Sequence, residues 1–425
     1  MPFPRYIVLI LLPSALMAQS AAEPASPPAL PVEELIRQAL DASPMLRAGA
    51  ESAGAAAEMA KAAGALPDPM AEVMFQDVGF PSYTVGKEEM SMLGVEVRQE
   101  LPYPGKRKAA RAEAGARISV SVAQWELERR RLAFQIRSAY SELYALDREL
   151  DILASSRELV DLMIAVATTR YGTGEADAGA VLRAQLKRDD IAVRLTDLAA
   201  RRAGLVAELN AMRGLPAVTP LGPVETLPGP QPPPPVEAVV KGSPDVAVAR
   251  TLVRKAEGAL DVARLETKPN FFVGAGLAAR GRYDPVTTLR FGVELPLWSK
   301  SKQIPMAHAA ERELEMARQE LAQAELEAAQ KAAALAARRE AAIQQSERYR
   351  ESILPRTSEA LAAARSAYLS GRGDFPAILE SLDLWLESRI ELTMRESARS
   401  SAEAELMFLA GNDPAVPEGE IHENR

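Results

Sequence analysis

The sequence contains no cysteine, so the chain can form no disulfide and offers no thiolate ligand, thiol nucleophile or cysteine for a lipid anchor. It has two histidines, His308 and His422, which cannot build a multi-histidine metal site in one chain. The 50 Lys and Arg stand against 58 Asp and Glu, a net charge of −8, whereas nucleic-acid binding needs a basic stripe. We therefore expect no metal, no cofactor and no nucleic-acid partner.

Catalytic motifs are also lacking. The sequence offers no evident Ser-His-Asp set and no phosphate-binding loop. Gly172-x-Gly174 and Gly371-x-Gly373 follow predicted helices rather than strands, which argues against nucleotide binding. We therefore expect that the protein is not an enzyme.

Residues 1–22 are predicted to be a secretory signal peptide. Arg5 precedes an apolar run that extends from Tyr6 to the region of Ala18, and small residues offer cleavage positions near Ala22. The run is too short for a comfortable membrane-spanning helix, and no other stretch reaches about 18 apolar residues. The chain is therefore expected to be exported.

Motifs recur in the same order in the two halves of the chain, roughly 200 residues apart, which indicates an internal duplication. The matched motifs are Ser43-Pro44 and Ser243-Pro244, Pro69 and Pro269, Glu100-Leu101-Pro102 and Glu294-Leu295-Pro296, Tyr171–Gly174 and Tyr368–Gly371, and Gly214 and Gly411. We predict a first repeat at 31–213, a proline-rich extended linker at 214–235, a second repeat at 236–411 and a tail at 412–425.

Each repeat is predicted to contain a helix, two strands, a very long helix, a turn and a further helix. The four long helices are expected at 106–169, 178–213, 304–367 and 376–410. In the first of them the apolar positions step by three and four, which favours left-handed coiled packing over a length of about 95 Å. These positions are Trp125, Leu132, Ile136, Ala139, Leu143, Leu146, Leu150 and Leu153; Leu314, Ala317, Leu321, Ala324 and Ala328 repeat the pattern.

Four segments carry the two-residue period of strands, at 70–76, 90–101, 270–278 and 287–296. Leu93, Val95 and Val97, for example, alternate with polar or glycine residues. The alternation fits a membrane barrel with lipid outside and water inside, or a soluble sheet whose apolar face packs on helices. Aromatic residues near these segments favour the barrel, as an interfacial belt would: Phe75, Phe80, Tyr83, Tyr103, Phe271, Phe272, Tyr283, Phe291 and Trp298.

Four strands cannot enclose a lumen, since even about eight leave an interior filled by side chains. Open strand edges are not tolerated in lipid. The strands of several chains must therefore combine. By closure and analogy we expect three chains to form a twelve-stranded barrel that continues into a long helical barrel, in a protein that is mainly α-helical.

The ordered set of motifs resembles the outer-membrane efflux proteins of the TolC family over nearly the whole mature chain. The motifs that carry the resemblance are the Tyr171–Gly174 and Tyr368–Gly371 turns, followed by Val181-Leu182 and Ile378-Leu379; Glu100–Arg107 and Glu294–Trp298; and Leu209-Asn210 to Gly214 and Leu409–Gly411. The Pro104–Arg107 turn is similar to the heavy-metal efflux branch of the family.

The resemblance implies a homotrimer in the cell outer membrane, in contact with its lipid, with a long periplasmic helical extension. It implies the channel of a tripartite efflux system, which conducts heavy-metal ions or drugs passively from a periplasmic adaptor protein and a proton-driven inner-membrane pump to the exterior. The alternative is a periplasmic coiled-coil adaptor or tether without a channel, which would explain the helices but not the strands.

The two helix turns are the candidate functional site, the periplasmic mouth and adaptor contact. Its predicted residues are Tyr171, Gly172, Gly174, Asp177, Arg183, Tyr368, Gly371, Gly373, Asp374 and Glu380. The four glycines are expected to allow positive φ at the reversals, and the two aspartates suit helix N-caps. The resemblance places an acidic ring of the closed mouth at Glu380, whereas the other acidic position is Ala377. Arg183 is the candidate ion-pair partner of Glu380.

Four methionines lie near the first strand pair: Met70, Met74, Met90 and Met92. Thioethers are soft ligands for Cu(I), but ordinary packing explains such residues as well. The sequence does not name the exported solute.

Overall fold

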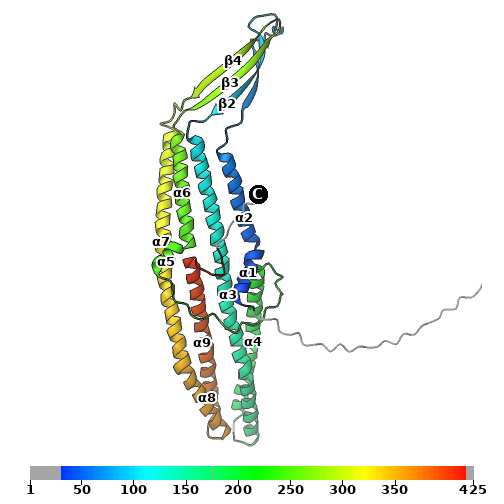
Figure 1. The fold of residues 1–425 in the computed structure, drawn as a ribbon. Coiled ribbons are helices and arrows are strands. Elements are labelled where there is room, and N and C mark those ends of the chain that lie inside the picture. The colour runs from blue at the N-terminus through cyan, green and yellow to red at the C-terminus, as the bar shows by residue number, and fades with distance from the viewer. Residues whose placement is uncertain (1–29, 176, 418–425) are drawn as a thin grey trace, which may run out of the picture.

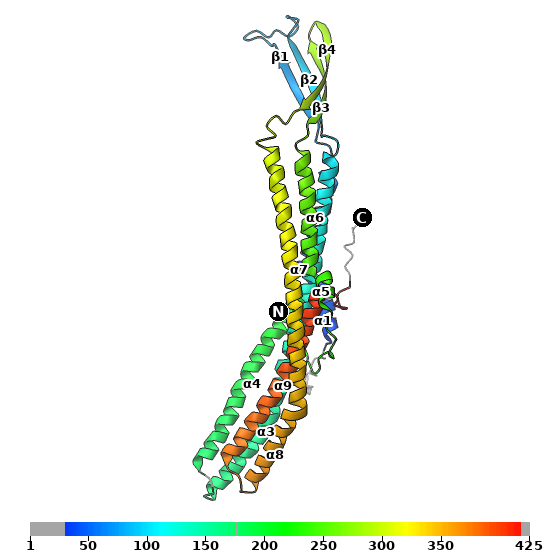
Figure 2. The ribbon, with the colours of Figure 1, turned by 90° about the vertical axis from the view of Figure 1, so that its left-hand side faces the viewer.

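The computed structural model describes residues 30–175 and 177–417, so the predicted signal peptide and His422 lie outside the described residues. A sheet stands at one end of an elongated molecule, and two helical hairpins form the other end (Figure 1). The lower helices are tilted relative to the upper ones, as the second view makes clear (Figure 2). Among the described residues, no helix combines the length and the apolar run needed to cross a membrane.

The sheet contains one pair of strands from each repeat, in the antiparallel order β1-β2-β3-β4. The strands are β1 (Met70–Gln76), β2 (Met92–Leu101), β3 (Asn270–Arg280) and β4 (Tyr283–Glu294). The contact between β2 and β3 joins the two repeats, with Val95 opposite Leu277. The outer edges of β1 and β4 have no strand partner within the described part of the protomer.

Strand β4 differs from the predicted range 287–296 at both ends. It begins at Tyr283, because a register shift after Ala278 lets Arg280 pair with Tyr283 close to the turn. It ends at Glu294, just before Pro296, which has no N–H group to donate to a strand ladder. Strand β2 begins two residues later than predicted.

The first helix of each repeat is broken in two, at the repeated Ser-Pro motif. Ser43 and Ser243 are N-caps whose hydroxyl oxygens lie 3.4 and 3.5 Å from the backbone nitrogens that donate to them, and a proline occupies the first helical position after each. Both features start a new helix. The resulting helices are α1 (Val32–Ala42), α2 (Pro44–Ala63), α5 (Val236–Gly242) and α6 (Pro244–Leu265).

The longer helices form the body of the molecule between the sheet and the opposite end, and the first of them spans that whole length (Figure 1). They are α3 (Lys106–Gly172), α4 (Ala178–Met212), α7 (Gln303–Arg348), α8 (Leu354–Leu369) and α9 (Phe375–Ala410). The single helix predicted at 304–367 is interrupted by a π-helical segment, Tyr349–Ile353. Pro355 follows directly, and its ring crowds the carbonyl four residues earlier, which the wider π turn accommodates.

Helix α3 is central and packs against α1, α2, α4, α6 and α9. The predicted heptad positions on α3 are buried in the main core at Leu132, Ile136, Leu143 and Leu153, and Trp125 and Leu150 are partly buried. The coiled packing predicted from the heptads is therefore present within the protomer.

The proline-rich linker crosses the middle of the helices as an extended chain and is held there by two buried carboxylates. Asp147 on α3 accepts a hydrogen bond from the Val224 backbone N–H at 2.8 Å and also forms an ion pair with Arg202. Glu403 on α9 accepts from the Gln231 backbone N–H at 3.3 Å and from Arg339 at 2.8 Å.

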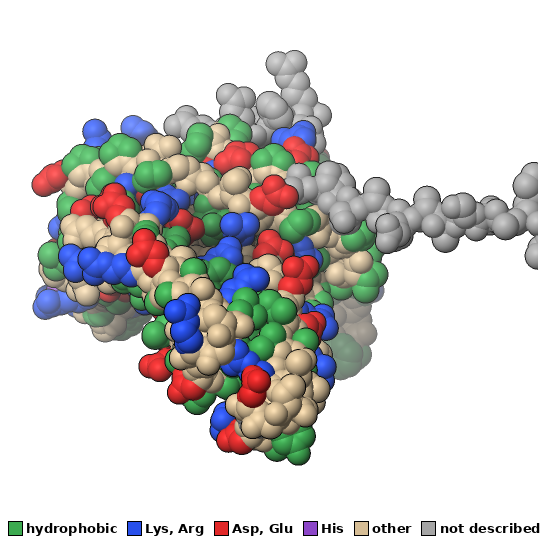
Figure 3. All heavy atoms as spheres, turned by 90° about the horizontal axis from the view of Figure 1, so that it is seen from below, with side chains coloured by type: hydrophobic (Ala, Val, Ile, Leu, Met, Phe, Trp, Pro, Cys, Tyr) green, Lys and Arg blue, Asp and Glu red, His purple; other side chains and the backbone are tan. Residues whose placement is uncertain are grey.

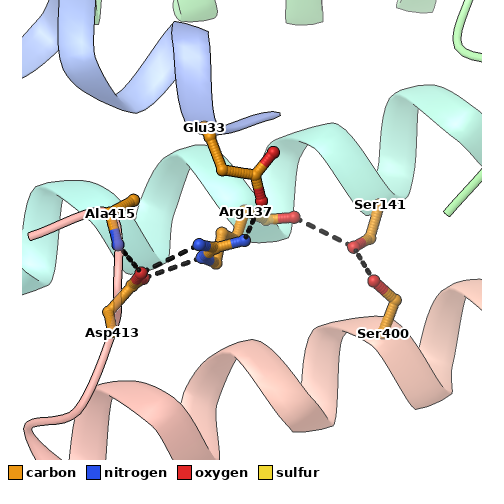
Figure 4. Close-up of polar contacts among 6 residues, drawn as sticks. All are labelled: Glu33, Arg137, Ser141, Ser400, Asp413 and Ala415. Carbon is orange, nitrogen blue, oxygen red and sulfur yellow. Dashed lines mark hydrogen bonds and ion pairs between the residues drawn. The ribbon is translucent and has the colours of Figure 1, made fainter. Parts of the chain in front are cut away.

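A buried ion pair holds the segment after α9 at the same level. Arg137 donates two hydrogen bonds to Asp413, at 2.7 and 2.8 Å, and one to Glu33 of α1 at 3.3 Å (Figure 4). Burial lowers the pKa of Arg137, but the hydrogen bonds and charge of Asp413 outweigh it, so the pKa lies above its ordinary value. The N-terminal helix, α3 and the C-terminal segment are thus fixed to one another.

Candidate functional site

The two hairpin turns are built alike, with a left-handed glycine at the same position of each repeat. Gly174 has a φ of 76° and Gly371 a φ of 77°. The prediction of positive φ is wrong for Gly172 and Gly373. Gly172 is the last residue of α3, where the backbone is helical, whereas Gly373 is needed for space, because an added Cβ would lie 3.1 Å from the carbonyl carbon of Ala367.

The aspartates after the turns cap the returning helices, as predicted. The carboxylate of Asp177 accepts from the Ala180 N–H at 2.9 Å, and that of Asp374 from the Ala377 N–H at 3.2 Å. Ala377, where the family resemblance would place an acidic residue, contributes its backbone to this cap.

The two tyrosines that match in the repeats have different surroundings. Tyr171 is 55% exposed, whereas Tyr368 is 3% exposed. Arg170 covers Tyr368, with its guanidinium 4.6 Å from the ring centroid and a hydrogen bond to the Tyr368 carbonyl, and Phe375 packs edge-on against the same ring. Burial raises the pKa of Tyr368. These contacts join the two hairpin turns within one protomer.

Arg183 and Glu380 are both exposed, and no ion pair joins them within the described part of the protomer. Arg183 lies 3.9 Å from Asp177 of its own hairpin, and its guanidinium lies 5.9 Å from the Phe375 ring centroid. The surface at this end mixes side chains of both charges (Figure 3).

The charge contact that does join α4 to α9 was missed from the sequence. Lys187 and Asp383 form an ion pair at 2.5 Å, and the Lys187 side chain is mostly buried. Each residue lies about one helical turn beyond the predicted partners, Arg183 and Glu380, and hence on the same helix face. The step of one helical turn from the predicted pair was the feature of the sequence that pointed to this ion pair.

A groove of about 660 Å³ opens between α3, α8 and α9 near the hairpin turns. Leu159, Leu361 and Trp385 supply much of its apolar lining. The Trp385 indole N–H donates to the Ser358 hydroxyl at 3.2 Å, which fixes the ring. Sequence reasoning did not find this groove, because its walls come from three separate helices.

The sheet has one apolar face that is largely bare. Val73, Phe75, Leu289 and Phe291 are each more than 60% exposed. No described helix covers them, so the alternative of a soluble sheet packed on helices is wrong for this protomer. An exposed apolar face of this composition is typical of a surface that contacts another protein or a membrane.

The opposite face of the sheet is polar, and two glycines on β3 leave room there for the side chains of the neighbouring strands. Glu96 of β2 and Arg290 of β4 reach across the intervening strand to form an ion pair at 3.3 Å. Gly274 and Gly276 lie beneath it, where a Cβ would approach the Glu96 side chain to 3.0 and 3.4 Å. The sequence showed the alternation of the strands but not this contact between strands that are not neighbours.

Three of the methionines share a face of the sheet: Met70 and Met74 on β1, opposite Arg98 and Gly94, and Met92 on β2, opposite Gln76, whereas Met90 lies in the loop. Among the described residues no group of three His, Cys, Asp or Glu side chains could hold a metal ion. A role of the thioethers toward a metal stays a prediction.

Comparison with known proteins tests the family resemblance and the fold. Residues 236–412 match the model of the family described as outer membrane efflux protein, and no curated protein matches the chain. The resemblance to outer-membrane efflux proteins is confirmed: the second half matches this family model, and the described chain has the fold of solved outer-membrane channels. The similarity to the heavy-metal branch stays a prediction.

Three solved structures illustrate the likeness. VceC of Vibrio cholerae aligns with a TM-score of 0.77 and 18% identity, over 89% of this chain and 96% of its own. CmeC of Campylobacter jejuni gives 0.75 and 12%, over 96% and 94%. MtrE of Neisseria gonorrhoeae, described in its open state, gives 0.69 and 15%, over 89% and 88%.

Proposed function

We propose that the chain is one protomer of a trimeric outer-membrane channel that conducts solutes outward without chemistry of its own. The observation that carries the proposal is a four-stranded sheet with two free edges and a bare apolar face, on top of a long helical bundle. Free edges need strand partners in lipid, and the apolar face suits lipid. The family description and the solved channels support the outer-membrane location.

The strand edges also weigh against a coiled-coil adaptor or tether, which would have no use for an open sheet. A test is electrophoresis of the outer-membrane fraction with and without boiling, followed by planar-bilayer recording of the purified protein. We expect a heat-labile trimer band and discrete conductance steps. A monomer found only in the periplasmic fraction would favour the tether.

The further partners would be a periplasmic adaptor and a proton-driven inner-membrane pump. The groove lined by Leu159, Leu361 and Trp385 supports an adaptor contact near the hairpin turns, because it is apolar, open and wide enough for side chains of a partner helix. Trp385→Ala should weaken adaptor crosslinking, whereas Leu326→Ala, an exposed apolar site on α7 far from the groove, should not. Equal loss from both variants would contradict this placement.

The hairpin turns would form the periplasmic mouth, closed at rest. Three copies of Glu380 near one axis would repel one another, and Arg183 of a matched hairpin would offset that charge. Arg183→Glu should loosen the mouth and raise single-channel conductance, as should Glu380→Arg, and the double swap should partly restore closure. Equal conductance of all four proteins would exclude this pair from gating and leave the Lys187–Asp383 contact to hold the helices.

The solute would be a heavy-metal ion or a drug, as the resemblance implies. Measuring the sensitivity of a deletion strain to a panel of metals and drugs, with and without the restored gene, would separate these classes.

A further inference from the structure

The loop between β4 and α7 contains two lysines and no acidic residue, although the whole chain is acidic. The lysines are Lys300 and Lys302. Other charged residues where the sheet meets the helices are Lys106, Arg107 and Lys108 in the first turn of α3, Lys268 before β3, and the acidic Asp68 and Glu266. Lys106 pairs with Glu266 at 3.2 Å. Lys300 and Lys302 are exposed, and no ion pair involves either within the described ranges.

The segment between β4 and α7, residues 295–302, also exposes large apolar side chains. Leu295 is 61% exposed, Leu297 76% and Trp298 77%. They continue the bare apolar face of β4, where Phe291 is 79% exposed. A short backbone turn fixes the segment, in which Ser301 and Lys302 both donate to the Trp298 carbonyl at 3.0 Å. In Figure 2 this loop lies beside the sheet, directly above the upper end of α7.

We propose that residues 295–302 bind anionic phospholipid at the periplasmic surface of the outer membrane. This inference rests on the outer-membrane location in the proposed function. Apolar side chains that continue the lipid-facing strand reach the acyl-chain boundary, a tryptophan suits the headgroup level, and two unpaired lysines beside it attract phosphate groups. The loops at the other end of the sheet mix both charges, with Glu88 and Glu89 beside Lys87, so the preference for anionic lipid is confined to one end.

The absence of cysteine makes the test direct, because any introduced cysteine is unique. Leu297→Cys carries a nitroxide label in trimers reconstituted in vesicles of phosphatidylethanolamine and phosphatidylglycerol, and collision with oxygen is compared with collision with a water-soluble nickel chelate. We expect preferential access of oxygen. Leu326→Cys is the control, because Leu326 is 68% exposed on α7 far from the sheet and should favour nickel.

A second measurement addresses the charges. Trimers with both Lys300→Gln and Lys302→Gln should retain several-fold less phosphatidylglycerol after detergent extraction than the wild type. Lys331→Gln on α7, which is exposed and lies away from the sheet, should change nothing. Label access to nickel at Leu297→Cys, or to neither reagent because a neighbouring subunit covers the loop, would overturn the proposal, as would unchanged lipid retention. Failure to form a heat-labile trimer would instead refute the proposed function.

Discussion

At the scale of single residues, a few buried polar groups hold distant parts of the chain together. Arg137 lies on α3 with the segment after α9 on one side and α1 on the other, so a single guanidinium fixes three separated parts of the chain (Figure 4). The sequence marks Arg137 as one of many charged residues of a long helix. Neither its burial nor its partner 276 positions away can be read from helical periodicity.

Arg137→Met should therefore destabilise the protein strongly. It leaves the Asp413 carboxylate buried without its cation, which typically costs about 3–5 kcal/mol. Arg148→Met on the same helix is the control, because the Arg148–Asp151 pair is exposed and worth about 0–1 kcal/mol. Thermal unfolding followed by circular dichroism measures both, and equal melting temperatures would contradict the assignment.

Tyr144 gives a pH-dependent prediction. Its hydroxyl donates to Glu396 at 2.7 Å, and Arg350 donates to the other Glu396 oxygen. Burial and the Glu396 carboxylate raise the pKa of Tyr144 to about 12. The pKa of Tyr144 is thus higher in the folded protein than in the unfolded chain, where it is about 10. The contribution of the protonated hydroxyl to the free energy of unfolding is therefore complete below about pH 10 and is lost as the pH rises through 12.

Tyr144→Phe should thus lower stability by about 1 kcal/mol near pH 8, and the difference from the wild type should shrink between pH 10 and 12. Melting temperatures of both proteins at pH 8, 10 and 11.5 test this. A difference that stays constant over that range would mean that the hydroxyl does not titrate as proposed.

At the scale of elements, periodicity identified the helices and strands, and local chemistry decided where they break. The sequence contained the signals for the breaks at Ser43-Pro44 and before Pro355, since serine caps and proline interrupts. The groove beside Trp385 was beyond reach, because it depends on how helices from different repeats come together. The pair Lys187–Asp383 lies one helical turn from the predicted pair Arg183–Glu380, and only the packing of α4 against α9 decides between the two. The alternation of the strands could be predicted from the sequence. The position of two glycines beneath the Glu96 side chain could not, because it depends on the register of β2 against β3.

The helix turns allow a matched comparison of glycines. Gly174→Ala places a Cβ at a φ of 76°, which costs about 1–2 kcal/mol. Gly172→Ala lies in a helical conformation with nothing within 4 Å, so it should be neutral or stabilise by up to about 1 kcal/mol. Limited proteolysis at the turn and the melting temperature report both changes. Equal behaviour of the two variants would show that backbone conformation does not limit the turn.

The helix core offers a second comparison between adjacent residues. Leu143 is fully buried and Glu142 is exposed. Leu143→Asp should introduce an unpaired buried charge and weaken folding and assembly by several kcal/mol, whereas Glu142→Gln should do little. The yield of heat-labile trimer measures this, and similar yields would contradict the core assignment.

At the scale of the whole molecule, the fold places the sheet and the hairpin turns at opposite ends, so orientation in the membrane becomes testable. The loop between β1 and β2 exposes Tyr83 at the far end of the sheet. We predict that a cysteine introduced by Tyr83→Cys is labelled by an impermeant maleimide in intact cells. Labelling only after the outer membrane is broken would reverse the proposed topology, and Leu182→Cys near the hairpin turn is the matched control that should label only then.

The π-helical segment Tyr349–Ile353 has no counterpart in the first repeat, where α3 continues without interruption to Gly172. The two hairpins therefore differ in build, since α3 is one continuous α-helix and the matching helix of the second repeat contains a wider π turn. In a trimer, the two kinds of hairpin would alternate around the axis. The tunnel end would then have three-fold rather than six-fold symmetry, because only three of its six hairpins would carry the π turn.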